Sequence, residues 1–247
     1  MSEKSLRRNM LSEIPSTDQD SGDLKIVIET PKGSRNKYRY DPDCDCLELV
    51  TVLPEGMMFP YNFGFVPSTL GEDGDPLDVF VLMDAPVIPG CVIRGRLIGV
   101  IKARQRGKKQ KEWIRNDRLI AVACHAQTHQ DEKSIKDLRP NLCEEITAFF
   151  IDYNKERSRE FEQLDLGGPR KALKIIKEGG AAFHVNTARM SRAARSRMGV
   201  RPHVAAREKS RIDLPARGSA IPHTPPRTSE SVIAGRSSVT DALRPHG

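Results

Sequence analysis

Short apolar segments in the first half of the chain alternate with breaks that are rich in proline and glycine. Leu24–Thr30, Leu47–Leu53 and Leu119–Ala123 contain five to seven residues each, which is short for a helix but typical of a strand. Two of these segments end directly before Pro31 and Pro54, and proline commonly bounds a strand. The pattern therefore predicts five or six short strands.

A longer strand is expected from Cys91 to Ile101, with a glycine in mid-course that suits the bend of a small barrel. Residues 102–111 come next, and six of these ten residues are Lys or Arg. A charge run of this kind is usually a solvated tip, so we predict a basic hairpin loop here.

Two helical patterns follow the strands. Apolar residues from Leu142 to Tyr153 recur at the spacing of one helix face, and this helix is expected to end near Ser158. A second, shorter helix is predicted to begin near Pro169 and to close at Gly179-Gly180. We therefore predict an α+β fold, in which a five-stranded, OB-like Greek-key β-barrel is flanked by two C-terminal helices.

The net charge of +7 is spread unevenly along the chain. Residues 185–247 hold 12 Lys+Arg against 4 Asp+Glu, a net charge of +8, which leaves −1 for the rest. This segment has no clear periodicity and is expected to be disordered, with at most one helical turn between Thr187 and Ser196. We expect a flexible arm (1–22), a folded domain (23–184) and an Arg-rich tail (185–247).

The sequence also carries information on the compartment. No apolar run reaches the ~18 residues of a membrane span, and the N-terminus lacks the apolar core of a signal peptide. The five cysteines are odd in number, and only Cys44 and Cys46 lie close together, so we expect most of them to be small buried side chains. These features predict a cytoplasmic protein without a membrane partner.

The segment Glu72–Asp78 contains four carboxylates in seven residues, and Gly74 and Pro76 favour a tight turn between them. Such carboxylates repel one another unless a cation lies among them, and Mg2+ prefers oxygen ligands. Taken alone, the segment is better explained as a solvated hairpin turn, because Asp, Gly and Pro are the commonest turn residues.

The surrounding sequence favours the metal site. Asp73 to Asp78 resembles the Asp-x-Asp-Pro-x-Asp signature of family I soluble inorganic pyrophosphatases, and the resemblance extends over about Leu24 to Gly180. Further segments resemble the family in its own order: Ile28–Pro31, Gly33–Tyr38, Phe59–Phe65, Pro67–Leu70 and the helix with Phe149, Phe150 and Tyr153.

The resemblance implies a Mg2+-dependent enzyme that hydrolyses pyrophosphate to two phosphates. It implies that Asp73 and Asp78 are metal ligands and that Asp75 activates the attacking water. We expect two further metal ligands: Asp117, which is next to an asparagine where the family has aspartate, and Glu112 on the basic loop.

The same resemblance implies that Lys37, Arg118 and Tyr153 bind the substrate phosphates. It implies that Glu29 supports the metals through water molecules. It also implies a homo-oligomer, commonly a hexamer in bacterial forms.

Several pocket positions depart from the family pattern. Arg39 stands where the family has a carboxylate, and Thr51 stands where it has an arginine. Phe59 and Phe63 replace two tyrosines, and Asn154 replaces a lysine. The lost arginine and hydroxyl groups predict weaker phosphate binding, since a charge-assisted hydrogen bond is worth about 1.5–3 kcal/mol. Arg39 or Arg35 could compensate.

One alternative belongs to a different class of protein. The barrel could bind phosphates without catalysis, and the basic tail could hold nucleic acid by non-specific phosphate contacts. No Phe, Tyr or Trp follows Phe183, so the tail offers no base-stacking side chains.

Overall fold

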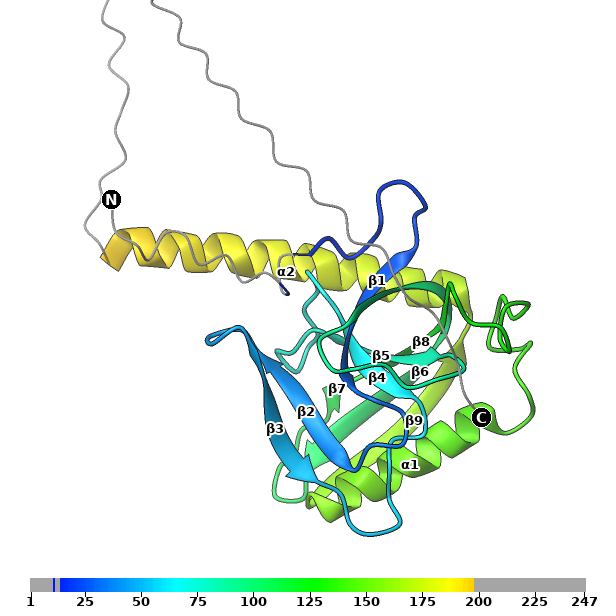
Figure 1. The fold of residues 1–247 in the computed structure, drawn as a ribbon. Coiled ribbons are helices and arrows are strands. Elements are labelled where there is room, and N and C mark those ends of the chain that lie inside the picture. The colour runs from blue at the N-terminus through cyan, green and yellow to red at the C-terminus, as the bar shows by residue number, and fades with distance from the viewer. Residues whose placement is uncertain (1–10, 12–13, 198–247) are drawn as a thin grey trace, which may run out of the picture. The chain divides into compact units, whose positions relative to one another are not determined.

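A computed structural model describes residues 11 and 14–197 of the chain. Within this range, nine strands and two helices follow one another (Figure 1). The strands are β1 (Leu24–Thr30), β2 (Asn36–Asp41), β3 (Cys46–Val52), β4 (Asn62–Val66), β5 (Leu77–Leu82), β6 (Val92–Gly107), β7 (Ile114–Arg115), β8 (Arg118–Ala123) and β9 (Arg159–Gly167). The helices are α1 (Leu142–Glu156) and α2 (Pro169–Arg197).

Five strands pair in a ring. The order is β1-β4-β5-β8-β6, and β6 pairs back onto β1. The β5–β8 pair is parallel and the other pairs of the ring are antiparallel. The predicted five-stranded barrel is therefore confirmed, and β2 and β3 form a separate hairpin beside it.

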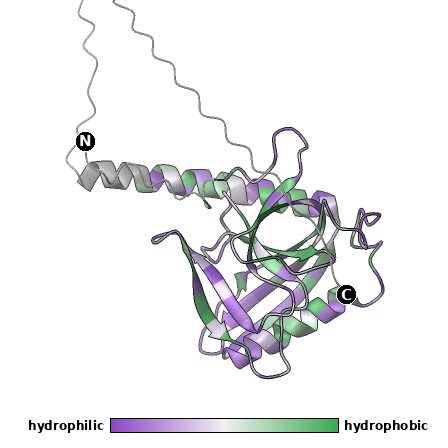
Figure 2. Ribbon diagram, in the orientation of Figure 1, coloured by the Kyte–Doolittle hydropathy of each residue, from purple (hydrophilic) through white to green (hydrophobic). Residues whose placement is uncertain are grey.

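The core fills this ring and extends to α1. Ring strands contribute fully buried side chains such as Ile28, Phe80 and Ile120, and α1 adds Ile146 and Phe150. Figure 2 shows both helices as mixtures of hydrophobic and hydrophilic residues, which is the pattern expected of helices with one buried face. The α1 helix thus covers apolar surface that the barrel alone would expose.

The basic loop predicted at residues 102–111 is mostly strand. β6 continues to Gly107, and its cationic residues face the acidic residues of β9, a strand that the sequence did not predict. Arg104 pairs with Glu162 at 2.8 Å and Arg106 pairs with Glu160 at 2.7 Å. Opposite charges directly across two strands stabilise the pairing, so these charges support the sheet.

The second helix is longer than predicted. Instead of ending at Gly179-Gly180, α2 continues to Arg197, so the disorder expected from Val185 is wrong for residues 185–197. A Cβ on Gly179 would lie 2.8 Å from Leu77 Cδ1, and the Gly179 carbonyl accepts a hydrogen bond from Leu70 N at 3.0 Å. The close approach of Leu70 and Leu77 therefore explains why a residue without a side chain occupies position 179 inside the helix.

The expected flexible arm is ordered from Ile14 onward. Thr17 forms a bridge with Leu24, and Ser68 Oγ donates to the carbonyl of Ile14 at 2.9 Å. The expectations for residues 198–247, including nucleic-acid binding, lie outside the described residues. Among the described helices, none is both long and apolar enough to cross a membrane.

The cysteines differ from the prediction that most are buried. Cys44 and Cys46 are exposed and form a disulfide in the turn between β2 and β3. Cys124 is exposed, and Cys91 and Cys143 are half-buried; all three are free thiols.

Candidate active site

One cavity of about 580 Å³ collects most of the predicted site residues. It lies where the acidic turn before β5, the β2–β3 hairpin and the end of α1 approach one another. Its lining includes seven predicted residues: Glu29, Lys37, Asp73, Asp75, Asp78, Arg118 and Tyr153. These residues come from separate segments of the chain, and the fold brings them to one place.

The acidic turn presents its carboxylates at one wall of this cavity. Asp75 N–H donates to Asp73 Oδ1 at 3.3 Å, which fixes the two residues relative to each other. Burial is the main cause that raises the pKa of Asp73 above its ordinary value, and the nearby charge of Asp75 also raises this pKa. The turn therefore concentrates negative charge that a cation would neutralise.

Asp78 and Arg118 form a buried ion pair across two parallel strands. Asp78 Oδ2 lies 2.7 Å from Arg118 Nη1. Burial raises the pKa of Asp78 to about 6, although Arg118 and Lys37 act in the opposite direction. The charged form of Asp78 therefore depends on positive groups nearby.

Arg118 has donor capacity left for a ligand. Its side chain is about 5% exposed, and its guanidinium lies 4.5 Å from the centre of the Phe150 ring. The buried Nε has no hydrogen-bond acceptor among the described residues. A buried donor without a partner is costly, and a phosphate oxygen in the cavity would supply the missing acceptor.

Glu29 and Lys37 form a second ion pair at the cavity wall. Lys37 Nζ lies 2.8 Å from Glu29 Oε2, and Glu29 Oε1 accepts a hydrogen bond from Tyr40 N at 2.7 Å. Lys37 Nζ also lies 4.5 Å from the centre of the Phe63 ring. Glu29 therefore holds the ammonium group of Lys37 directly, in addition to facing the cavity.

The positions where the family has tyrosine form an aromatic floor. Phe59 and Phe63 are 1% and 3% exposed, and their ring centres lie 5.4 Å apart. Tyr153 lies against Phe59 with ring centres 6.0 Å apart, and its hydroxyl accepts a hydrogen bond from Arg157 Nη1 at 3.0 Å. Tyr153 therefore keeps its own O–H proton available for a ligand.

Two predicted metal ligands do not line this cavity. Asp117 is buried, pairs with Arg115 at 2.7 Å and accepts a hydrogen bond from Ala103 N at 3.1 Å. Glu112 is exposed and lines neither this cavity nor its neighbour. Asn116 lines the cavity in place of Asp117.

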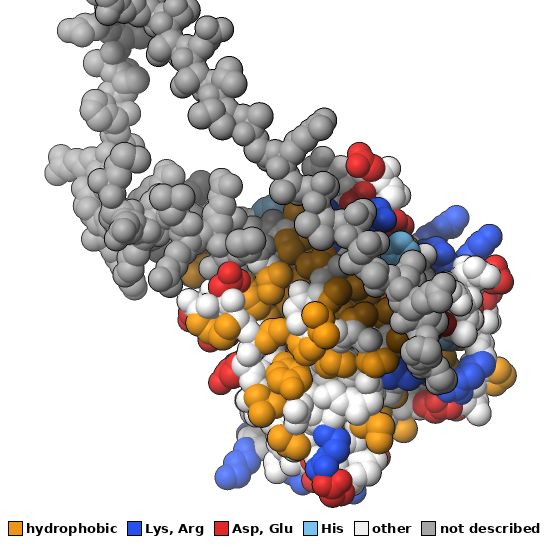
Figure 3. Space-filling view, in the orientation of Figure 1, with side chains coloured by type: hydrophobic (Ala, Val, Ile, Leu, Met, Phe, Trp, Pro, Cys, Tyr) orange, Lys and Arg blue, Asp and Glu red, His pale blue; other side chains and the backbone are white. Residues whose placement is uncertain are grey.

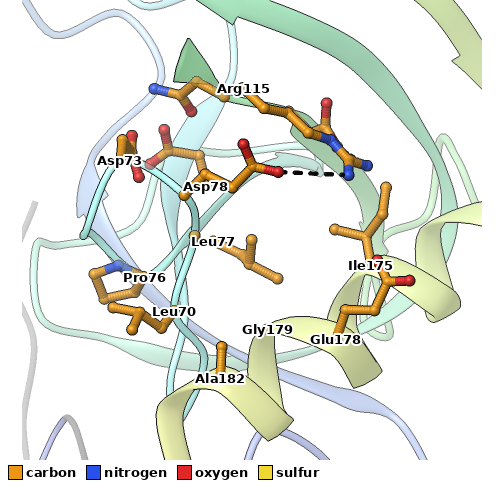
Figure 4. A pocket seen from close by; sticks show the side chains of 14 residues that line it. Leu70, Asp73, Pro76, Leu77, Asp78, Arg115, Ile175, Glu178, Gly179 and Ala182 are labelled. Atoms are coloured by element: carbon orange, nitrogen blue, oxygen red, sulfur yellow. Dashed lines mark hydrogen bonds and ion pairs between the residues drawn. The ribbon is translucent and has the colours of Figure 1, made fainter. Parts of the chain in front are cut away.

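A second cavity of about 300 Å³ adjoins the first, and Figure 4 shows the residues that line it. Asp117 and Arg115 line it, together with Ile175, Glu178 and other residues of α2. Asp73, Pro76, Asp78 and Asn116 line both cavities. The turn thus separates a charged cavity from one that has α2 as a wall.

Sequence reasoning missed six polar residues of the larger cavity: Tyr40, Asp41, Asp43, Gln105, Arg157 and Arg159. One signal was available, because Arg157 follows Tyr153 by four residues and therefore lies on the same side of the helix end. Gln105 and Arg159 lie in the part of β6 and in the strand that were not predicted. Of the two arginines proposed to compensate for Thr51, Arg39 lines the cavity and Arg35 does not.

The donor set of the acidic turn fits a hard divalent cation. Asp73 and Asp78 offer carboxylate oxygens, the ligand type that such a cation prefers, and the charge of Asp73 also raises the pKa of Asp78. Within residues 11 and 14–197, no three Asp, Glu, His or Cys side chains already converge as a complete metal site. Asp78 instead faces Arg118, so a bound cation would share or replace that contact.

The comparisons with known proteins agree with this geometry. Residues 26–184 match the family described as inorganic pyrophosphatase. The soluble inorganic pyrophosphatase 2 of Chlamydomonas reinhardtii is 40% identical over 155 residues, which cover 63% of this chain and 78% of that protein. The inorganic pyrophosphatase of Synechocystis is 36% identical over 168 residues, which cover 68% of this chain and 95% of that protein.

Solved structures show the same relationship. The inorganic pyrophosphatase from Thermus thermophilus superimposes with a TM-score of 0.63 and 31% sequence identity, covering 70% of this chain and 98% of that one. The comparisons therefore place this barrel among the enzymes that hydrolyse phosphoric anhydrides. This chain belongs to the inorganic pyrophosphatase family.

Proposed function

We propose that this chain hydrolyses pyrophosphate to two orthophosphates in a Mg2+-dependent reaction within the larger cavity. The observation that carries the proposal is the convergence of Glu29, Lys37, Asp75, Arg118 and Tyr153 with the two other aspartates of the turn. The family to which the chain belongs supports the same reaction.

The aspartates of the turn have different roles in this proposal. Asp73 and Asp78 hold divalent cations, and the bound metal supplies a polarised water and neutralises phosphate charge. Asp75 takes the proton from the attacking water. Its carboxylate is exposed and has no ion pair among the described residues, which leaves it available as a base.

The substrate phosphates are bound by the opposite groups of the cavity. Arg118 donates through its free Nε, and Tyr153 donates its hydroxyl proton, because Arg157 already supplies a donor to its oxygen. Lys37 contributes charge and is held in place by Glu29. As the P–O–P bridge breaks, these donors stabilise the charge on the leaving phosphate.

The proposal is tested by phosphate release from pyrophosphate in the presence of Mg2+. We expect Asp75→Asn and Asp78→Asn to abolish release, and Glu72→Gln to retain it. Glu72 lies in the same turn, but it is exposed and does not line the larger cavity, so it controls for effects on the turn itself. If the wild-type protein releases no more phosphate than Asp75→Asn does, the proposed activity is refuted.

We also propose a cytoplasmic homo-oligomer, with a hexamer expected. The three free thiols are compatible with a reducing compartment, whereas the Cys44–Cys46 disulfide is not typical of one. Figure 3 shows hydrophobic side chains gathered on one face, and exposed apolar residues include Ile88 at 76% and Met58 at 50%. Such surface often marks an interface. Light scattering coupled to size exclusion tests the assembly, and a monomer mass would contradict it.

A further inference from the structure

The side chain of Asn116 lies in the wall that the two cavities share. In the extended segment before β8, neighbouring residues point to opposite sides. Asp117 accordingly pairs with Arg115 at 2.7 Å and lines only the smaller cavity, whereas Asn116 and Arg118 both line the larger one. Beside the arginine, this segment therefore presents a neutral amide to the larger cavity, and not a carboxylate.

Arg118 orients the amide of Asn116. Arg118 Nη1 donates to Asn116 Oδ1 and also to the backbone carbonyl oxygen of Asn116, the latter at 3.1 Å. A guanidinium has donors only, so the amide atom that faces it is the oxygen. The backbone is held as well, because Asn116 N–H donates to the carbonyl of Ala103 at 2.9 Å. The amide oxygen is thus occupied, and the NH2 group lies on the side away from the guanidinium.

The NH2 group of Asn116 is free to donate to a ligand. In the described part of the chain, Asn116 Nδ2 makes no hydrogen bond. The buried side-chain polar atoms that lack a partner there are Arg118 Nε and Glu132 Oε2. Since Asn116 Nδ2 is not one of them, it is not sealed off by protein and remains open at the half-buried side chain.

Two free donors therefore belong to side chains in contact, Arg118 and Asn116. Neither side chain attracts a cation, because the guanidinium is positive and the amide oxygen already accepts from it. A phosphate oxygen accepts hydrogen bonds from both kinds of donor. Since Arg118 lines only the larger cavity, an anion that meets both side chains lies there.

We propose that Asn116 is a substrate-binding residue, whose NH2 group donates to an oxygen of the phosphate that Arg118 binds. This inference rests on the proposed function, from which it takes the role of Arg118. It gives this position to the anion and not to the metal.

The uncharged amide also determines which ions this position favours. An aspartate at position 116 would offer a divalent cation another carboxylate, and it would repel phosphate and compete with it for Arg118. Asparagine removes that repulsion and adds a donor to a cavity in which Phe59 and Phe63 have no hydroxyl group. The wild-type residue is therefore expected to favour phosphate binding at the expense of metal binding.

Two affinities distinguish a phosphate donor from a metal ligand. Titration calorimetry measures Mg2+ binding without phosphate, and then pyrophosphate binding at saturating Mg2+, with Asp75→Asn present throughout to prevent turnover. Asn116→Ala is expected to weaken pyrophosphate binding about tenfold, which is about 1.4 kcal/mol, and to leave Mg2+ affinity unchanged. A loss of Mg2+ affinity, or an unchanged affinity for pyrophosphate, would overturn the proposal.

The same pair of measurements separates direct donation from a merely structural role. If Asn116 acted only by holding Arg118, its loss would disturb the contact of Arg118 with Asp78, and Mg2+ affinity would change together with pyrophosphate affinity. Asn116→Asp has the same shape and keeps an acceptor for Arg118, but it has no N–H group. It is expected to bind Mg2+ more tightly and pyrophosphate more weakly than the wild-type residue does. Wild-type affinity for pyrophosphate in this variant would overturn the proposal.

Asn141→Asp is the matched control for the added charge. Asn141 is exposed before α1, its side chain makes no capping hydrogen bond, and it lines neither cavity, so both affinities should stay unchanged. Because no turnover is required, failure of the wild-type protein to release phosphate would refute the proposed reaction without affecting these titrations. Conversely, phosphate release by a wild-type protein whose pyrophosphate affinity is insensitive to Asn116→Ala would overturn the role of Asn116 alone.

Discussion

The guanidinium of Arg118 lies 2.7 Å from the carboxylate of Asp78 because the two residues occupy the same level of adjacent parallel strands. Each immediately precedes a residue of the registered pair Val79 and Leu119. The single parallel pairing of the ring thus places a cation beside the last carboxylate of the acidic turn. Both the stability of the barrel and the chemistry of the cavity depend on this contact.

Arg118→Ala is expected to destabilise the protein strongly. Removing one partner of a buried ion pair leaves the other charge uncompensated, which costs about 3–5 kcal/mol. The control is Arg139→Ala, because Arg139 pairs with Glu145 on the surface, where both side chains are 52% exposed, and exposed pairs contribute about 0–1 kcal/mol. Urea denaturation in EDTA measures both losses, and equal losses would contradict the prediction.

Mg2+ binding is expected to weaken below pH 6. The pKa of Asp78 is raised to about 6, so at lower pH a cation must displace a proton from this carboxylate, which costs up to about tenfold in affinity per pH unit. The rise in melting temperature with added Mg2+, measured from pH 5 to 8, reports this affinity. A rise that is independent of pH would contradict the prediction.

Removing the metal should also change how stability depends on pH. For Asp78 the folded pKa of about 6 exceeds the ordinary value of 3.8, so the folded state binds the proton more tightly. The resulting stability is fully present below about pH 3.8 and is lost as the pH rises through about 6. Melting curves in EDTA should show this loss, and saturating Mg2+ should reduce it.

The two adjacent glycines of α2 should respond differently to alanine. In a helix interior this change normally stabilises by up to about 1 kcal/mol, and Gly180→Ala should do so, because its nearest neighbour would be Ser68 O at 3.9 Å. Gly179→Ala would place Cβ 2.8 Å from Leu77 Cδ1 and 3.3 Å from Leu70 O. For Gly179→Ala we therefore expect a smaller gain in the free energy of unfolding than for Gly180→Ala, or a loss.

The same pair should differ in activity. Leu70 and Leu77 border the acidic turn, so pressure from a Cβ at Gly179 is expected to lower kcat/KM for pyrophosphate, whereas Gly180→Ala leaves it unchanged. Urea denaturation and steady-state kinetics on both variants test this. Identical behaviour of the two variants would show that the contact has no influence on the turn.

Asp84 is expected to stabilise the fold above acidic pH. Hydrogen bonds from the Thr128 side chain and from the backbone N–H groups of Gln127 and Thr128 lower its pKa to about 2. The stabilisation is therefore present above the ordinary pKa of 3.8 and is lost as the pH falls through about 2.

Asp84→Ala should accordingly lower the urea midpoint at pH 7, with a difference from wild type that narrows as the pH falls from 4 toward 2. Asp152→Ala serves as the control, because Asp152 is exposed on α1 and its side chain makes no hydrogen bond or ion pair among the described residues. A difference that stays constant with pH would point to a cause other than the Asp84 carboxylate.

Local sequence patterns predicted the parts of the site that depend on one segment. The spacing of Asp73, Asp75 and Asp78 determines their place in a turn, and the i, i+4 pattern of α1 correctly placed Tyr153 on its inner face. The choice between Asn116 and Asp117 could not be made in this way. Neighbouring residues of an extended chain point to opposite sides, and the side that meets the cavity depends on contacts with a distant strand, because both residues are hydrogen-bonded to Ala103 on β6.

Other features depend on contacts between distant segments. β9 has few buried apolar residues, and its register depends on ion pairs such as Arg104 with Glu162, so apolar periodicity could not reveal it. Gly179 resembles a helix terminator in sequence, yet it lies inside α2 because Leu70 and Leu77 approach it. Tertiary packing outweighed local propensity in both cases.

The order of the strands has a consequence for synthesis on the ribosome. All five strands of the ring lie before residue 124, whereas α1, which supplies Ile146 and Phe150 to the core, is made later. The nascent barrel can complete its backbone pairing while the rings of Phe63 and Phe80, which later pack against Phe150 of α1, are still uncovered. Until α1 emerges, these rings are exposed apolar surface of the kind that makes partly folded chains prone to aggregate.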